Sequence, residues 1–290
     1  MINKIKKYNF KPGLPQEFEI LDLAQLYQEF TDELTSPHRT EFYQILWFQQ
    51  GTPSHLVDFN PIKIEPNTLL FVNKNSVQRF DEEADFKGKV VLFTDSFFCK
   101  SKADTKFLRS SFLFNDLLSI SQINVSESIS TFAISFKQLE TELNNSKDDY
   151  QSDILRSQLQ NLLLHSERER RKKDGVELKK DADFDAALLF EQLLDDNFIN
   201  QKKVSFYCQR MHLTPKKLNR ATKRIFGKTP KELIDERVML ASKRLLWHTS
   251  ESIKEIAFSL GFDEPTNFIK YFKKHTGKTP VVFRAEFATA

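Results

Sequence analysis

The sequence predicts an α+β protein of more than one domain, in which an antiparallel β domain and a helical segment precede an all-α domain with two tandem helix-turn-helix units. Three observations lead to this fold class. Residues 42–95 contain short runs of β-branched and aromatic residues separated by turn residues, and apolar residues recur at three- and four-residue spacing over much of residues 126–171. The third observation is an internal repeat in the last hundred residues, where Gly-Lys-Thr-Pro occurs at residues 227–230 and again at residues 277–280.

Runs of strand length lie in the first half of the chain. Turn residues separate them, for example at Gly51–Pro53 and at Lys87–Gly88. The connections are too short to hold crossover helices, so we expect antiparallel pairing in a barrel or a sandwich. The predicted strands are Phe42–Gln49, Ser54–Phe59, Ile62–Ile64, Leu69–Val72 and Lys89–Thr94.

The periodicity becomes helical after about Ser96. Two apolar stripes, on either side of a polar break at Asn144–Asp149, predict two helices between Ser126 and about Arg171. Packing inside the molecule and contact with a second copy of the chain both explain such stripes. The stripes are Phe132, Phe136, Leu139 and Leu143, then Ile154, Leu155, Leu159, Leu162 and Leu163, and they are preceded by Phe107, Phe112, Leu113, Leu117 and Leu118.

A domain boundary is expected at residues 166–183, which are almost entirely polar and contain Gly175. Charge changes after it: residues 202–290 hold 19 Lys and Arg against 8 Asp and Glu, a net charge of +11, whereas residues 1–201 carry −8. A basic end attracts a polyanion such as nucleic acid. The expected division is 1–100 for the β domain, 101–170 for the helical segment, 171–183 for a linker and 184–290 for the C-terminal domain.

The composition argues against a membrane protein and against an enzyme. No apolar run reaches the roughly 18 residues of a bilayer span, and no apolar segment follows the basic N-terminus as in a signal peptide. Cys99 and Cys208 indicate free thiols in the cytoplasm rather than a disulfide framework. His38 and His55 are isolated, and neither a nucleophile elbow nor a glycine-rich phosphate loop occurs, so we expect no catalytic residue, no metal site and no cofactor.

The first copy of the repeat predicts a short helix, a tight turn and a longer helix. Lys203–Met211 leads through His212–Leu213 into a helix that Thr214 caps, Pro215 begins and Gly227 ends. The expected inward face of this longer helix consists of Leu218, Ala221, Thr222 and Ile225.

The second copy repeats this order. Ile253–Leu260, with a capping box of Ser252 and Glu255, leads through Gly261–Asp263 into a helix that ends at Gly277. Its expected inward face consists of Phe268, Tyr271, Phe272 and His275. Between the copies, a capping box at residues 229–232 starts a helix that runs to about Trp247 and buries Leu233, Val238, Ala241, Leu245 and Leu246.

The outward faces of the two longer helices are basic at matched positions. Arg and Lys donate to guanine edges, Asn pairs with adenine, and the remaining cations meet phosphate. A solvated face explains one such helix, but two matched copies favour double-stranded DNA. The predicted base contacts are Lys216, Asn219, Arg220, Thr266, Asn267 and Lys270. The predicted phosphate contacts are Lys217, Lys223, Arg224, Lys273, Lys274 and Lys278.

Residues 184–290 resemble the DNA-binding domain of the AraC/XylS family. The motif is most specific in the second unit, where residues 253–263 read IKEIAFSLGFD and residues 268–280 continue with F-x-x-x-F-K-K-x-x-G-x-T-P. The resemblance implies a transcription regulator whose two longer helices enter successive major-groove segments on one face of DNA. Two residues depart from the family pattern, because His212 stands at the usual glycine of the turn and Thr222 at a usual aromatic position. We therefore expect a looser or repacked first unit.

The β region and its helices resemble the AraC-type N-terminal domain, a cupin-like barrel with a helical dimerisation segment. The tracts that carry this resemblance are residues 42–48, 64–69 and 91–98. It implies a small-molecule effector in the N-terminal domain, a homodimer and contact with RNA polymerase. Aromatic walls with one cation suit a small polar ligand, although ordinary core packing explains the same residues. The candidate pocket residues are Tyr43, Trp47, Phe71 and Arg79.

Two functions follow from these observations. The first is an effector-responsive, sequence-specific transcription regulator. The second is a cupin-type small-molecule enzyme or sensor whose basic domain binds nucleic acid nonspecifically. The matched longer helices, and a sequence without clustered metal ligands, favour the first.

Overall fold

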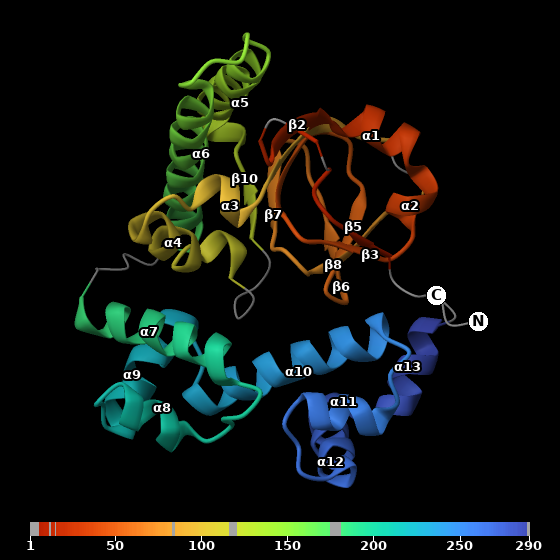
Figure 1. The fold of residues 1–290 in the computed structure, drawn as a ribbon, viewed down its shortest axis with the longest axis vertical. Helices are drawn as coiled ribbons and strands as arrows, with labels where there is room; N and C mark the ends of the chain where they lie inside the picture. Colours follow the sequence, from red (N-terminus) through yellow and green to blue (C-terminus); the bar gives the residue numbers. More distant parts are fainter. Residues whose placement is uncertain are drawn as a thin grey trace. The chain divides into compact units, whose positions relative to one another are not determined.

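The structure, a computed structural model, describes residues 6–288 except residues 12, 15, 83–84, 116–120 and 175–180. The chain forms two compact units, residues 6–177 and residues 178–290 (Figure 1). Leu117, Leu118 and Gly175, with most of the middle of the expected linker, lie outside the described residues.

The unit of residues 6–177 contains two five-stranded sheets. Among the described strands, neighbours pair in antiparallel fashion except β1 and β3, and no pair joins one sheet to the other, so these strands do not close a barrel. One sheet has the order β1 (Lys6–Tyr8), β3 (His38–Thr40), β8 (Val77–Phe80), β5 (Ser54–Val57) and β6 (Asn60–Lys63). The other has the order β10 (Gln122–Asn124), β7 (Thr68–Val72), β4 (Tyr43–Gln50), β9 (Lys87–Phe93) and β2 (Phe18–Asp22).

Two details of the predicted strands are corrected. The strand expected to run to Phe59 ends at Val57, because Asp58 and Phe59 both have positive φ and form the two-residue turn between β5 and β6. The expected turn at Lys87–Gly88 lies inside β9. Gly88 is required there by a close approach of two strands, since a Cβ atom would lie 2.0 Å from the carbonyl oxygen of Trp47.

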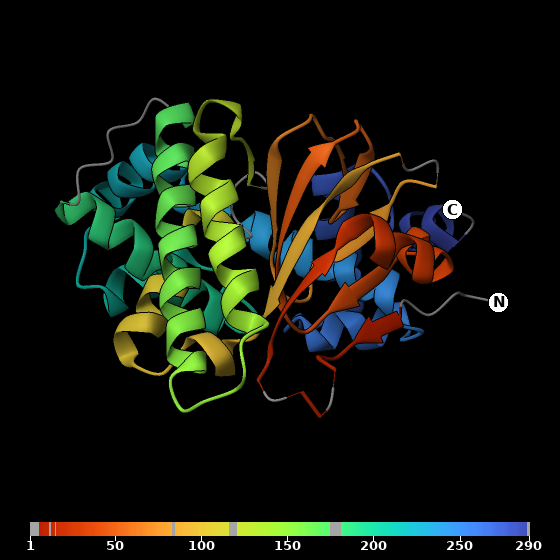
Figure 2. The ribbon, with the colours of Figure 1, turned by 90° about the horizontal axis from the view of Figure 1, so that it is seen from above.

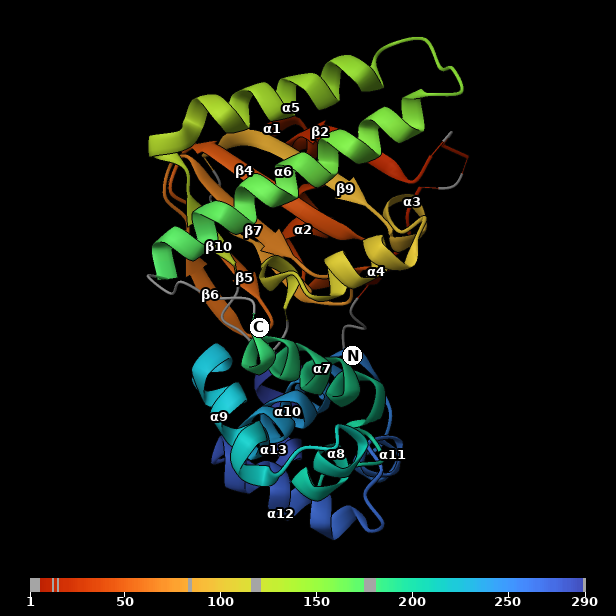
Figure 3. The same cartoon turned by 90° about the vertical axis from the view of Figure 1, so that its left-hand side faces the viewer.

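Strand β4 is buried on both faces. Leu46 and Phe48 pack between the two sheets with residues such as Phe80, whereas Ile45 and Trp47 face the helices that cover the outer side of their sheet. Those helices are α3 (Asp95–Phe98), α4 (Lys102–Arg109), α5 (Ile129–Leu143) and α6 (Gln151–Asp174). Figures 2 and 3 show α5 and α6 side by side across this sheet. Two short helices, α1 (Leu23–Glu29) and α2 (Thr31–Thr35), follow β2.

The apolar stripes of α5 and α6 pack within the molecule. Phe132, Phe136 and Leu139 are buried against the sheet together with the leucines expected in α6. Ile154 differs from the prediction: it is exposed, because it lies beside Leu155 on a different face of α6. The stripes therefore do not by themselves provide a surface for a second copy.

The unit of residues 178–290 is all-helical in its described part. Helix α10 contacts α9, α11, α12 and α13, and so connects the two halves of the unit (Figure 1). Leu233, Val238 and Leu246 of α10 are buried as expected, whereas Ala241 and Leu245 are only half-buried. The helices are α7 (Ala182–Asn197), α8 (Val204–Arg210), α9 (Pro215–Phe226), α10 (Pro230–His248), α11 (Ile253–Ser259), α12 (Pro265–Thr276) and α13 (Pro280–Ala288). No helix within the described ranges is long and apolar enough to cross a membrane.

Candidate nucleic-acid interface

The turns between α8 and α9 and between α11 and α12 have the same backbone geometry. His212 and Gly261 both have left-handed φ, of 53° and 70°. The amide of the next residue donates back to the end of the short helix at the same distance in both copies: 3.0 Å from Leu213 to Cys208, and 3.0 Å from Phe262 to Ala257. The alignment of His212 with the glycine of the second turn is thus confirmed.

The longer helices α9 and α12 also match. Each has 12 residues, begins with proline and ends at a left-handed glycine, Gly227 or Gly277. The amides of these glycines donate to Lys223 and Lys273, four residues earlier. The helices differ at their starts, because Thr214 caps α9 with its side chain whereas Glu264 makes no side-chain cap on α12. The predicted capping boxes of α10 and α11 are present.

The buried faces of these helices explain the departure at Thr222. In α12, Phe268 and Phe272 are fully buried and their rings lie 5.8 Å apart. In α9, Leu218, Ala221 and Thr222 are fully buried, so a small side chain occupies the place of a phenyl ring. The hydroxyl of Thr222 donates to the carbonyl of Asn219, which satisfies it inside the helix. The first unit is therefore repacked with smaller residues.

The residues predicted to meet DNA lie on the opposite faces of α9 and α12. Of the predicted base contacts, Asn219 is half-buried and the other five are exposed. All six predicted phosphate contacts are exposed. Two of these cations have internal partners, since Lys278 pairs with Glu286 and Arg224 pairs with Asp181.

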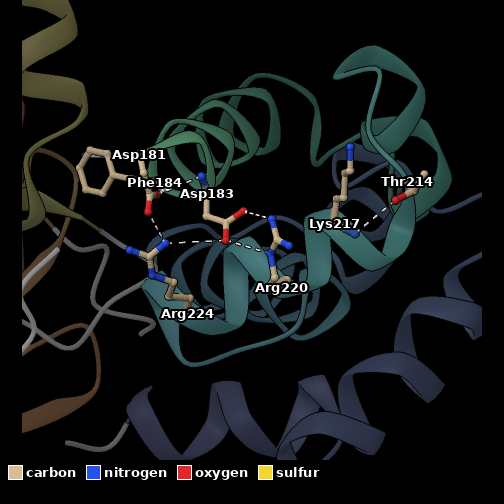
Figure 4. Close-up of polar contacts among 7 residues, drawn as sticks. All are labelled: Asp181, Asp183, Phe184, Thr214, Lys217, Arg220 and Arg224. Atoms are coloured by element: carbon tan, nitrogen blue, oxygen red, sulfur yellow. Dashed lines mark hydrogen bonds and ion pairs between the residues drawn. The ribbon is translucent and has the colours of Figure 1, made fainter. Parts of the chain in front are cut away.

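Two acidic residues at the start of α7 hold the arginines of α9 (Figure 4). Asp183 accepts from Nε of Arg220 at 2.9 Å and from Nη2 at 2.7 Å. Asp181 accepts from Nη1 of Arg224 at 2.6 Å and also caps α7 through the amides of Asp183 and Phe184. Hydrogen bonds from Arg220 and Arg224 hold the pKa values of Asp183 and Asp181 below their ordinary range. Sequence reasoning missed this pairing, because it joins residues about 40 positions apart and only the N-cap signal of Asp181 was local.

Lys202 ties the second turn to the segment after α7. Its ammonium donates to the carbonyls of Leu260 at 2.7 Å and of Ile199 at 2.5 Å. Burial lowers the pKa of Lys202. Gly261 packs against the same segment, where a Cβ atom would lie 2.1 Å from the carbonyl oxygen of Ile199. These contacts fix α11 relative to the helices of the first half.

The four predicted pocket residues of the N-terminal unit do not form one cluster. Tyr43, Trp47 and Phe71 belong to the hydrophobic cluster under the helices that cover the outer side of their sheet. Arg79 lies on β8 in the other sheet, opposite Leu56 and between Gln78 and Phe80. Because side chains alternate along a strand, Arg79 faces away from the core to which Phe80 belongs.

A polar group lies instead in the core between the two sheets. His55 is fully buried, its ring is 4.4 Å from that of Phe80, and its Nε2 lies 3.1 Å from Oε1 of Gln78. Oε1 can only accept, so Nε2 carries the hydrogen and Nδ1 is an acceptor. Nδ1 has no hydrogen-bond partner among the described residues. Burial lowers the pKa of His55 to about 3, so the ring is neutral at pH 7.

Comparison with known proteins agrees with this architecture. Residues 21–160 match the model of an AraC-like ligand binding domain, and residues 207–286 match that of a helix-turn-helix domain. The HTH-type transcriptional activator RhaS of Enterobacter sp. (strain 638) is 22% identical over 84% of this chain and 85% of its own. The bifunctional transcriptional activator/DNA repair enzyme AdaA of Bacillus subtilis (strain 168) is 33% identical over 33% of this chain, a stretch that spans 46% of AdaA.

A solved structure of ToxT from Vibrio cholerae O395 is also similar, at 16% identity, with a TM-score of 0.46 over 94% of this chain and 99% of that one. The two family matches lie in the same order as the two structural units, ligand binding domain first and helix-turn-helix domain second. The chain therefore belongs to the AraC family and is a DNA-binding transcription regulator.

Proposed function

We propose that α9 and α12 read DNA bases in two segments of the major groove. The observation that carries this proposal is the match between the two helices in length, C-terminal glycine cap and turn geometry, with exposed basic residues at equivalent positions such as Arg220 and Lys270. The base contacts are Lys216, Asn219, Arg220, Thr266, Asn267 and Lys270. The phosphate contacts are Lys217, Lys223, Arg224, Lys273, Lys274 and Lys278.

The test compares Lys270→Ala with Lys274→Ala in the full-length protein. Loss of a base contact, as expected for Lys270→Ala, should weaken binding to the specific site by about 1–3 kcal/mol and relax the preference at one base pair. Loss of a phosphate contact, as expected for Lys274→Ala, should weaken binding to all sequences alike. Excess unrelated DNA should not compete with the specific site at near-physiological salt. Equal competition by unrelated DNA would support the alternative, a basic domain that binds nucleic acid nonspecifically.

The N-terminal unit, in this proposal, binds a small effector between its two sheets. A buried acceptor without a partner is unfavourable unless something donates to it, and Nδ1 of His55 is such an acceptor. Apolar residues of both sheets surround it. The effector is accordingly a small, largely apolar molecule with a hydroxyl or amide donor. A second candidate location lies under the helices, where the indole nitrogen of Trp47 is also buried and has no hydrogen-bond partner in the described part of the chain.

Two variants separate these locations. The full-length protein is incubated with the small-molecule fraction of a bacterial extract, and retained compounds are identified by mass spectrometry. Loss of a retained compound in His55→Leu but not in Trp47→Phe supports the site between the sheets. The reverse result places the effector under the helices.

The regulator acts, we propose, as a cytoplasmic homodimer that contacts RNA polymerase and performs no chemistry of its own. Ile134 of α5 and Leu164 of α6 are exposed apolar residues of the helical segment 101–170. Ile134→Glu should shift a dimer to monomer in sedimentation if that segment joins two copies. An unchanged dimer would place the interface elsewhere.

A further inference from the structure

Arg220 is held by Asp183 in a way that leaves one edge of its guanidinium open. A guanidinium has five N–H groups, and the contacts to Asp183 use Nε and one hydrogen of Nη2. The second hydrogen of Nη2 and one hydrogen of Nη1 point together along the other edge. That pair has the geometry with which arginine donates to O6 and N7 of guanine.

The exposure of the two side chains agrees with this arrangement. The Arg220 side chain is 66% exposed, whereas that of Asp183 is 16% exposed. The carboxylate is therefore the enclosed partner, and the arginine extends from it toward solvent. If Asp183 shielded Arg220 from solvent, less of the arginine side chain would be exposed.

Asp183 is itself in a fixed position. It lies in the first turn of α7, which packs along α9, and its backbone amide donates to the cap residue Asp181. The positive end of the helix dipole favours a carboxylate there. An unpaired arginine would lose rotamer entropy when it becomes ordered on DNA, and the contact with Asp183 removes part of that loss beforehand.

The second helix-turn-helix has no equivalent pairing within the described residues. Lys270 stands at the position of Arg220, and among the residues that the structure describes no acid pairs with it or with Lys274. At this position the first helix-turn-helix thus presents an oriented and neutralised arginine, while the second presents an unpaired lysine. Charge of the second kind adds to nonspecific attraction, whereas orientation adds to discrimination between bases.

We propose that Asp183 is a specificity-determining residue that positions Arg220 to read a guanine. This inference rests on the proposed base contact of Arg220. As a consequence, Arg220 contributes base preference with little salt dependence, whereas the unpaired Lys270 at the equivalent position contributes more of the salt dependence.

The experiment measures binding of full-length variants to the selected operator and to operators changed at each base pair, at several salt concentrations. Arg220→Ala first identifies the base pair that Arg220 reads. Asp183→Ala should then reduce the guanine preference at that base pair about tenfold, while affinity for unrelated DNA stays the same or rises because a negative charge is gone. In the double variant Asp183→Ala/Arg220→Ala the preference should equal that of Arg220→Ala alone.

Asp195→Ala is the matched control, because it removes one acid from the other end of α7 and breaks a similar pair with Arg237. It should leave the base preference unchanged. If Arg220→Ala alters no base preference, the proposed contact fails. If Arg220→Ala does so but Asp183→Ala behaves like Asp195→Ala, the positioning role alone is refuted. A guanine preference that rises in Asp183→Ala would show that Asp183 competes with DNA, which also overturns the proposal.

Discussion

Alanine substitutions at three glycines separate the effect of backbone conformation from the effect of close packing in the two helix-turn-helix units. Gly227, Gly261 and Gly277 all have positive φ, which disfavours an L side chain by about 1–2 kcal/mol. At Gly227 and Gly277 a Cβ atom would meet nothing within 4 Å, so the conformational effect is the whole effect. At Gly261 the same atom would lie 2.1 Å from the carbonyl oxygen of Ile199, and backbone must move to admit it. Overpacking of this kind adds about 1–3 kcal/mol.

Gly261→Ala should therefore destabilise the unit of residues 178–290 by about 2–5 kcal/mol, compared with about 1–2 kcal/mol for Gly227→Ala or Gly277→Ala. The assay is urea unfolding of the full-length chain in a Trp47→Phe background, where buried Trp247 in α10 is the only tryptophan. Equal unfolding free energies for Gly261→Ala and Gly227→Ala would refute the close approach of the turn to Ile199. A loss at Gly227 larger than at Gly261 would refute the reasoning altogether.

Three further predictions concern the first turn, the lysine that ties the second turn and the buried histidine. His212→Gly should stabilise the same unit by about 1 kcal/mol, because His212 has left-handed φ, and an unchanged urea midpoint would contradict this. Lys202→Met, which keeps the aliphatic stem but removes the donor to Leu260 and Ile199, should destabilise it by about 1–2 kcal/mol, and a neutral result would show that these carbonyls find other donors. Because the folded pKa of His55, about 3, lies below the ordinary value of 6.5, its contribution is fully present above pH 6.5 and declines as pH falls toward 3. The urea midpoint of residues 6–177, followed by Trp47 in a Trp247→Phe background, should fall less over this range in His55→Gln than in the parent, and parallel curves would contradict the prediction.

The sequence predicted the second half of the chain more closely than the first, for physical reasons. Helix ends depend on local signals, so the capping box of Ser252 and Glu255 and the stop at Gly227 were readable from neighbouring residues. The repeat added a second, independent copy of the same pattern. Residues such as Phe268 and Phe272, four positions apart, then fell on one face as expected.

The first half depends on contacts that have no local signal. Gly88 was expected to mark a turn, but it allows two paired strands to approach closely. Tyr43 and Arg79 were grouped by residue type, yet β4 and β8 belong to different sheets. The pairs of Asp181 and Asp183 with the arginines of α9 are likewise tertiary contacts without a local sequence signal. Both acids lie well before the basic residues from which the DNA-binding face was predicted.

The most direct test of the central claim is a selection of genomic DNA fragments by the full-length protein at near-physiological salt, followed by sequencing of the retained fragments. Two matched recognition helices predict two short conserved blocks about 10 base pairs apart. Arg220→Ala should relax one block, and Lys270→Ala the other. Fragments retained without any shared block, and equally by the parent and both variants, would contradict sequence-specific reading by α9 and α12.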